Sequence, residues 1–97
     1  MRLRLTPRAY GDLVTISSYI AEEQQQPLAA NAVMQRLENA LDRITSNPFI
    51  GKRSFMPDTR ELTVSNLPFT IVYRVIRDTI VVTTIFHEAR DPHKKHD

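Results

Sequence analysis

The first half of the chain carries hydrophobic residues at the spacing of a short strand and two amphipathic helices. Residues 2–5 alternate arginine with leucine, which predicts a half-buried strand. Thr6 and Pro7 are residue types that favour a helix N-cap and first helical position. Apolar residues then recur every three or four positions up to the polar run 22–27, and again in a second helix over about 28–46. The predicted apolar stripes are Ala9, Leu13, Ile16 and Ile20 in the first helix, with Asp12, Ser17 and Glu22 facing away, and Ala30, Met34, Leu37, Leu41 and Ile44 in the second.

The second half of the chain is predicted to contain one long loop and three strands. Pro48 disfavours helical geometry at Asn47 and so ends the second helix. Residues 48–59 show no period and are expected to form the loop. Three alternating or β-branched segments predict the strands, at 60–64, 69–76 and 80–86. Strict alternation in the middle strand places Phe69, Ile71, Tyr73 and Val75 on one face and Thr70, Val72, Arg74 and Ile76 on the other.

The predicted order of elements is β-α-α-β-β-β within a single domain spanning residues 1–97. This order favours the α+β class, with a helical hairpin packed on one face of a small, mainly antiparallel sheet. The charged residues 88–97 are expected to form a C-terminal tail. The other face of the sheet is less protected, and a half-open apolar face of this kind suggests a bound partner. The residues expected to contact that partner are Val72, Ile76, Val81 and Ile85 on the sheet, with Tyr10 and Tyr19 on the first helix.

Composition narrows the functional classes. The absence of cysteine excludes a disulfide scaffold, a thiolate zinc site and a cysteine nucleophile. The chain has no apolar run long enough for a transmembrane helix, and its start lacks the apolar stretch of a signal peptide. A cytoplasmic protein without membrane contact is therefore expected. The net charge of +2 arises entirely from residues 52–97. This excess is too small for sequence-specific binding of duplex DNA by the chain alone, although a basic patch for an acidic or phosphate-bearing partner stays open.

Five short sequence patterns follow one another along residues 3–90. They are Leu5-Thr6-Pro7-x-Ala9-x-x-Asp12-Leu13-x-x-Ile16-x-x-Tyr19-Ile20-Ala21, Asn47-Pro48-x-x-Gly51-Lys52, Arg60-x-Leu62-x-Val64, Pro68-Phe69-Thr70-Ile71-Val72-Tyr73-Arg74-Val75 and Ile85-Phe86-His87-x-x-Arg90. In this order they resemble the ParE/RelE superfamily of bacterial toxins, and the last pattern is similar to the ParE branch. Two features depart from the family pattern: Thr70 stands where an arginine or a similar residue is common, and Met56-Pro57 is atypical of the loop.

The resemblance implies the toxin of a type II toxin–antitoxin module of the plasmid stabilisation type. Such a toxin inhibits growth and is held in a hetero-oligomer by a small cognate antitoxin. ParE-type members poison DNA gyrase by trapping its cleaved-DNA complex, whereas RelE-type members cut messenger RNA on the ribosome. The shared fold does not decide between the two targets, because functional sites are grafted onto folds. A third alternative, an interaction module without toxicity, would be favoured if the adjacent reading frame encoded no small antitoxin.

The candidate catalytic residues bear on the choice of target. Cleavage of RNA through its 2′-hydroxyl requires a general base, cations that hold the phosphate and a proton donor. Arg60 and Arg74 offer the cations, but only His87 and the inward-facing Tyr73 offer acid–base chemistry. Each residue also has a structural interpretation: an ion pair or aromatic stack for the arginines, a backbone hydrogen bond for the histidine and core packing for the tyrosine. Gyrase poisoning requires only a binding surface, so the sequence favours a non-enzymatic toxin, with an endoribonuclease as the alternative.

No cofactor or metal site is predicted. The histidines at 87, 93 and 96 are irregularly spaced near a charged tail, and no carboxylate lies at a ligand-like offset on a well-predicted helix or strand. The surface that meets the target is expected to combine the polar loop 48–59 with the exit from the last strand. Its residues are Lys52, Arg53, Arg60, Arg74, His87, Arg90, Lys94 and Lys95.

Overall fold

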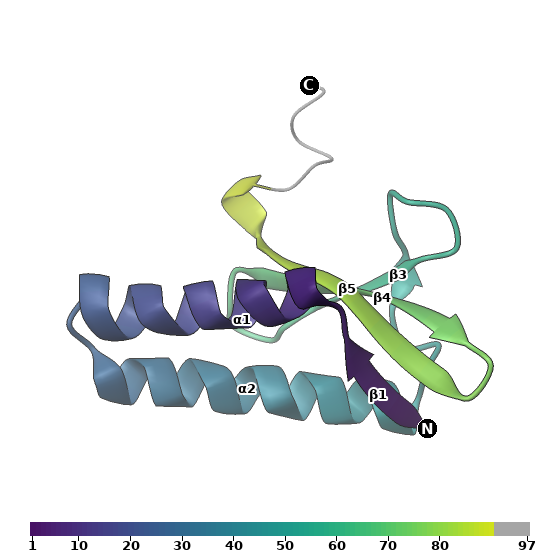
Figure 1. The fold of residues 1–97 in the computed structure, drawn as a ribbon, viewed down its shortest axis with the longest axis horizontal. Helices are drawn as coiled ribbons and strands as arrows, with labels where there is room; N and C mark the ends of the chain where they lie inside the picture. Colours follow the sequence, from purple (N-terminus) through teal and green to yellow (C-terminus); the bar gives the residue numbers. More distant parts are fainter. Residues whose placement is uncertain (91–97) are drawn as a thin grey trace.

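A computed structural model describes residues 1–90, apart from the side chains of Glu23 and Arg90, and places a helical layer beside a sheet (Figure 1). In chain order the elements are β1 (Arg2–Leu5), α1 (Pro7–Ser18), a π-helical turn (Tyr19–Glu23), α2 (Pro27–Ser46), β2 (Lys52–Arg53), β3 (Arg60–Thr63), β4 (Phe69–Ile76), β5 (Thr79–His87) and a 3₁₀ turn (Glu88–Arg90). The predicted α+β class and the order of its elements are confirmed. The structure adds the short strand β2 within the segment that was expected to be loop.

The strands of the described region form one sheet in the order β1-β5-β4-β3-β2. Only β1 runs parallel to its neighbour, and the other pairs are antiparallel. In Figure 1 the two helices run antiparallel, and the sheet lies beside them. The helical stripes pack on the sheet as the periodicity predicts, since Ala9, Leu37 and Ile44 are fully buried with Ile71, Tyr73 and Val82 of the sheet. Burial of these apolar side chains is the main force that holds the two layers together.

Local residue chemistry fixes the start of α1 and the end of α2 as predicted. Thr6 caps α1: its hydroxyl accepts a hydrogen bond from the Ala9 amide at 3.1 Å, and Pro7 occupies the first helical position. The same hydroxyl donates to the Thr83 carbonyl on β5 at 3.0 Å, which ties the start of the helix to the sheet. At the other end of the hairpin, α2 stops at Ser46, just before Asn47 and the proline that follows it.

A β-bulge in β5 corrects the predicted face of Ile85. Val72 pairs with Thr84, but the next residue, Tyr73, pairs with Val82, so no residue of β4 lies opposite Thr83 in the register. One extra residue in a strand shifts the alternation of every side chain beyond it. Ile85 therefore lies opposite Ile71 on the helix side and is only 3% exposed. Its predicted place on the less protected face is wrong, because that prediction assumed strict alternation along the strand.

Beyond Val82, no strand of the described region pairs with the outer edge of β5, and α1 supplies hydrogen bonds there instead. β1 pairs with β5 only as far as Val82. Beyond that point Asp12 of α1 accepts hydrogen bonds from the Thr84 hydroxyl and the Ile85 amide, both at 2.9 Å. The carboxylate thus takes over the role of a neighbouring strand. The expectation that Asp12 faces away from the sheet is wrong. Its hydrogen-bond partners lie more than seventy residues away in sequence, so the local helical pattern does not reveal them.

The sheet face away from the helices is less open than predicted. Val72 is fully buried and Val81 is 8% exposed, so the expected exposure of both is wrong. Val72 lies in a central strand, directly between Glu61 on β3 and Thr84 on β5, and these neighbours on both sides leave it little accessible surface. Of the apolar residues predicted to lie open on the sheet, Ile76 is the exposed one, at 43%.

None of the helices in residues 1–90 combines the length and apolarity that crossing a membrane requires.

Candidate functional site

Tyr73 fastens the segment after α2 onto the sheet. Its side chain is fully buried, and its hydroxyl donates to the Pro48 carbonyl at 2.8 Å while accepting from the Gly51 amide at 2.9 Å. Burial raises the pKa of this hydroxyl, an effect that the Gly51 amide and the charge of Arg60 partly offset. The neutral phenol is thus the state that the fold favours. With its proton and its oxygen both engaged by the backbone, Tyr73 acts as a structural anchor in this conformation.

Gly51 sits where no side chain fits. A β-carbon at this position would lie 2.7 Å from the Tyr73 hydroxyl oxygen and 2.8 Å from the Glu61 carbonyl oxygen. Distances this short are incompatible with packed atoms. The glycine therefore allows the segment to approach β3 and β4 closely enough for its amide and carbonyl to be used.

Arg60 is held in place from two sides. One terminal nitrogen of its guanidinium donates to the Gly51 carbonyl at 2.7 Å, and the guanidinium lies over the Phe49 ring, 4.9 Å from the ring centre. A stacked cation of this kind gains from the electron-rich face of the ring. Because a guanidinium carries five N–H donors, this arrangement fixes the group and leaves most of its donors free. Arg60 therefore presents a positioned positive charge at the edge of the sheet.

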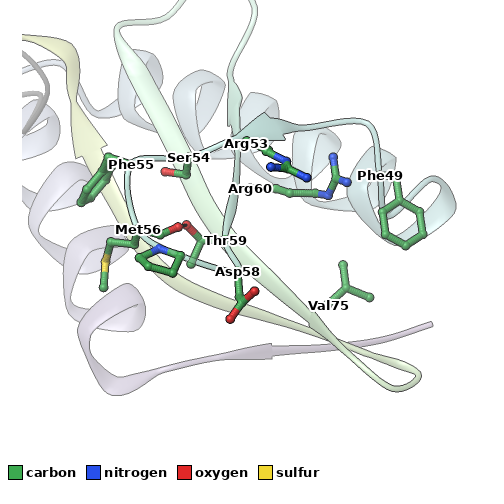
Figure 2. A pocket seen from close by; sticks show the side chains of 10 residues that line it. Phe49, Arg53, Ser54, Phe55, Met56, Asp58, Thr59, Arg60 and Val75 are labelled. Atoms are coloured by element: carbon green, nitrogen blue, oxygen red, sulfur yellow. Dashed lines mark hydrogen bonds between the residues drawn. The ribbon is translucent and has the colours of Figure 1, made fainter.

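Arg53 joins Arg60 at the mouth of a surface cavity of about 560 Å³. The two arginines lie directly opposite each other in the β2–β3 ladder. Within residues 1–90, neither guanidinium forms an ion pair. Figure 2 shows both arginine side chains beside Phe49, with Asp58 and Val75 farther along the cavity. The remaining lining comes mostly from the loop between β2 and β3, namely Ser54, Phe55, Met56, Pro57 and Thr59.

The other predicted catalytic residues do not reach this cavity. Arg74 follows Tyr73 on β4 and is exposed on the opposite face, where it pairs with Val81. His87 lies opposite Phe69, five residues away from Arg74 along the strand, or roughly 17 Å at the usual rise. Its ring contacts Phe69 edge-on at 5.4 Å, and its Nδ1 accepts a hydrogen bond from the Ala89 amide at 3.0 Å. Arg60, Arg74 and His87 thus occupy three separate places.

The remaining predicted binding residues are distributed as follows. Lys52 and Arg53 are both exposed on β2, but Lys52 lies opposite Glu61 and so faces away from the arginine cavity. Tyr10 and Tyr19 are exposed on the helical layer, at 62% and 55%. Three predicted positions lie outside what the structure describes: Lys94, Lys95 and the side chain of Arg90. Within residues 1–90, no group of three metal-binding side chains comes together.

Sequence reasoning missed three residues of this region. Phe49 and Ser54 line the cavity, and Gly51 makes it possible. The available signal was an aromatic residue two positions before a lone glycine, followed directly by Lys52-Arg53. That pattern indicates a loop. It does not predict that Arg60 stacks on Phe49, because this contact depends on where β3 lies relative to the loop.

Comparisons with known proteins agree with this fold. Residues 3–92 match a family described as the ParE toxin of the type II toxin–antitoxin system parDE. The candidate toxin Y4kP of Sinorhizobium fredii is 36% identical over 91 residues, which cover 94% of this chain and 93% of Y4kP. A structure of the chromosomal ParDE system from P. aeruginosa is similar with a TM-score of 0.77 at 27% identity, over 90% of this chain and 95% of that one. The isolated E. coli RelE toxin has a TM-score of 0.68 at 19% identity, over 98% and 92% of the two chains, a likeness of fold alone.

Proposed function

The chain belongs to the ParE toxin family of type II toxin–antitoxin systems, and on this premise we propose that it arrests growth by trapping DNA gyrase on cleaved DNA. Its place of action is the cytoplasm, where gyrase and DNA meet. The toxin needs no catalytic group of its own for this activity. It needs a surface that binds the cleaved complex more tightly than the resealed one, because a ligand shifts an equilibrium only by its differential affinity.

The separation of the candidate nuclease residues carries the proposal. General acid–base catalysis requires the acid, the base and the phosphate-binding cations within hydrogen-bond reach of one reacting group. Here Arg60 lies at the β3 edge, Arg74 on the other sheet face and His87 at the far end of β4 and β5. The Tyr73 hydroxyl is engaged by Pro48 and Gly51. A missing acid or base typically lowers a rate by about 10²–10⁴-fold, so this arrangement supports binding over RNA cleavage.

The arginine cavity and the end of β5 are the surfaces that we assign to the target. Arg53 and Arg60 present positive charge at one edge of the sheet, and neither forms an ion pair with a described residue. The 3₁₀ turn Glu88–Arg90 follows β5 at the opposite end of the β4–β5 pair. Both surfaces carry exposed charged residues, Arg53 in the cavity and Glu88 after β5, as a surface for a nucleoprotein complex requires.

We assign the neutralising partner, a small antitoxin, to the exposed apolar residues of the helical layer. Tyr10 and Val14 lie one helical turn apart on α1, and they are 62% and 48% exposed. Tyr19 and Leu28 extend the apolar surface around the end of the hairpin, at 55% and 82%. The similar P. aeruginosa chain comes from a ParDE system, and the similar E. coli RelE fold is also known in a complex with its antitoxin. A stable complex would bury about 1,600 Å² or more.

Expression of the chain without its antitoxin tests the target. Induction should activate a DNA-damage reporter and produce filaments, and the purified chain should cause linear plasmid to accumulate when it is incubated with gyrase and supercoiled DNA. Addition of the neighbouring gene product should suppress both effects. Rapid arrest of translation, with messenger RNA cut at ribosomal positions and supercoiling unaffected, would instead establish the RelE-like endoribonuclease.

A further inference from the structure

The cross-strand pair Arg53–Arg60 is a feature that folding alone does not explain. Like charges directly opposite each other on neighbouring strands destabilise a sheet. The two side chains nevertheless line the same cavity, and within residues 1–90 no carboxylate forms an ion pair with either of them. Asp58 is the acid among the lining residues, and it makes no ion pair with the arginines. A bound anion would relieve the repulsion, and the forked guanidinium geometry matches a phosphate.

Phe49 adds a second kind of contact to the same cavity. Its ring carries Arg60 on one side and is still 64% exposed, so a flat group has room to stack on it. Exposed aromatic rings beside positive charge are typical of proteins that hold single-stranded nucleic acid, since the bases stack and the phosphates pair with cations. The cavity of about 560 Å³ is open to solvent, so a strand can enter it from the surface.

Ser54 provides an independent observation at the same place. Its hydroxyl oxygen is buried and has no hydrogen-bond partner among the described residues, and Ser54 lines the cavity. Buried polar atoms are almost always hydrogen-bonded, so an unsatisfied one calls for a ligand or a bound water.

We infer that the Arg53–Arg60 cavity binds a phosphate group of single-stranded DNA, with the adjoining base stacked on Phe49. The inference rests on the proposed function for its setting, because a cleaved gyrase complex presents a broken DNA strand to a bound toxin. It does not require recognition of base sequence, since every base has a face that can stack. Arg60 is already held by the Gly51 carbonyl, so little ordering is needed when the strand binds.

Fluorescence anisotropy with the full chain, freed from its antitoxin, tests the inference. The probe is a labelled DNA strand of about 12 nucleotides and mixed sequence, within the usual site sizes. Arg53→Gln should weaken binding by about tenfold. The slope of log K against log salt concentration should also become shallower by about one, as expected for the loss of one phosphate contact. Arg4→Gln is the matched control, because Arg4 is exposed on β1 at the opposite edge of the sheet, and it should change binding by less than about twofold. Equal effects of the two substitutions would overturn the inference.

An abasic version of the strand tests the stacking contact. The parent protein should bind the abasic strand at least about fivefold more weakly than the intact strand, whereas Phe49→Leu should bind both equally. The duplex of the same sequence should also bind more weakly, because its bases are already stacked. Equal binding of abasic and intact strands by the parent would contradict the assignment. If AMP displaces the labelled DNA strand and binds as tightly as the strand does, the cavity is reassigned to a free nucleotide. If an RNA strand of the same sequence binds more tightly than the DNA strand, the cavity is reassigned to RNA.

The gyrase assay separates this inference from the proposed function. Loss of strand binding in Arg53→Gln, together with failure of the parent to trap cleaved plasmid, would leave the cavity assignment standing and remove the gyrase target. If the parent traps cleaved plasmid but does not bind the strand, the gyrase target stands and the cavity assignment is overturned. Circular dichroism of each variant confirms that the fold is retained, which is expected for Arg53→Gln because the Arg53 side chain makes no hydrogen bond or ion pair with described residues.

Discussion

Replacement of Gly51 by alanine tests how the site is held together. The added β-carbon would lie 2.7 Å from the Tyr73 hydroxyl oxygen, 2.8 Å from the Glu61 carbonyl oxygen and 2.9 Å from an edge carbon of the Tyr73 ring. The Glu61 oxygen belongs to the backbone of β3, and the tyrosine is fully buried, so neither can move into solvent. The chain segment from Pro48 must therefore lift away from the sheet.

The expected cost follows from these contacts. Overpacking in a well-packed region costs about 1–3 kcal/mol. Lifting the segment also breaks the hydrogen bond between the Gly51 amide and Tyr73 and weakens that between Tyr73 and Pro48, each worth about 0.5–1.5 kcal/mol. Together these effects lower the free energy of unfolding by about 2–5 kcal/mol, a large share of the roughly 5–10 kcal/mol of a small domain. In a chain of this length the melting temperature should fall by at least about 10 °C.

Gly11 is the matched control, because it is the other glycine of the chain and the same substitution meets nothing there. It lies within α1, and a β-carbon built on it has no atom within 4 Å. Gly11→Ala should raise the free energy of unfolding by about 0.5–1 kcal/mol through helix propensity. Thermal and urea unfolding followed by circular dichroism measure both variants. A Gly51→Ala protein within about 0.5 kcal/mol of the parent would refute the close approach of this segment to Tyr73.

Three further predictions concern the anchor, the core and the target surface. Tyr73→Phe should lower the free energy of unfolding by about 1–3 kcal/mol, because it leaves the Gly51 amide and Pro48 carbonyl unpaired. The pKa of Tyr73 is raised above 10.0, so the parent keeps its stability advantage over Tyr73→Phe below pH 10 and loses it as the pH rises further. Urea titrations at increasing pH should therefore show a shrinking difference in the free energy of unfolding between the two proteins. Leu41→Ala should cost about 2–5 kcal/mol in the same assay, and a parent-like curve would contradict the register of α2. In plasmid-cleavage assays His87→Ala should reduce gyrase trapping only modestly and deletion of residues 88–97 strongly; the opposite order would refute the assignment of the exit as a target surface.

The fold was largely predictable because its signals are local. The helices follow from apolar residues within one or two turns of each other, and Thr6, Pro7 and Pro48 mark their ends by their own backbone chemistry. The strands β4 and β5 follow from their β-branched composition in the same way. What failed depends on partners that are distant in sequence. The bulge at Thr83 is a property of the β4–β5 pairing, and no pattern within β5 alone contains it.

The candidate site was less predictable for the same reason. The sequence drew attention to Arg53, Arg60 and Tyr73, but it offered no means of deciding which of them share a face with which partner. The two-residue strand β2 sets Arg53 directly opposite Arg60, and a strand so short leaves almost no alternation to read. Tyr73 and Gly51 meet across 22 residues, and their contact brings the Gly51 carbonyl within reach of Arg60. The residue types that give the site its chemistry can thus be read from the sequence. Their arrangement cannot, because it depends on the close approach of Gly51 to Tyr73.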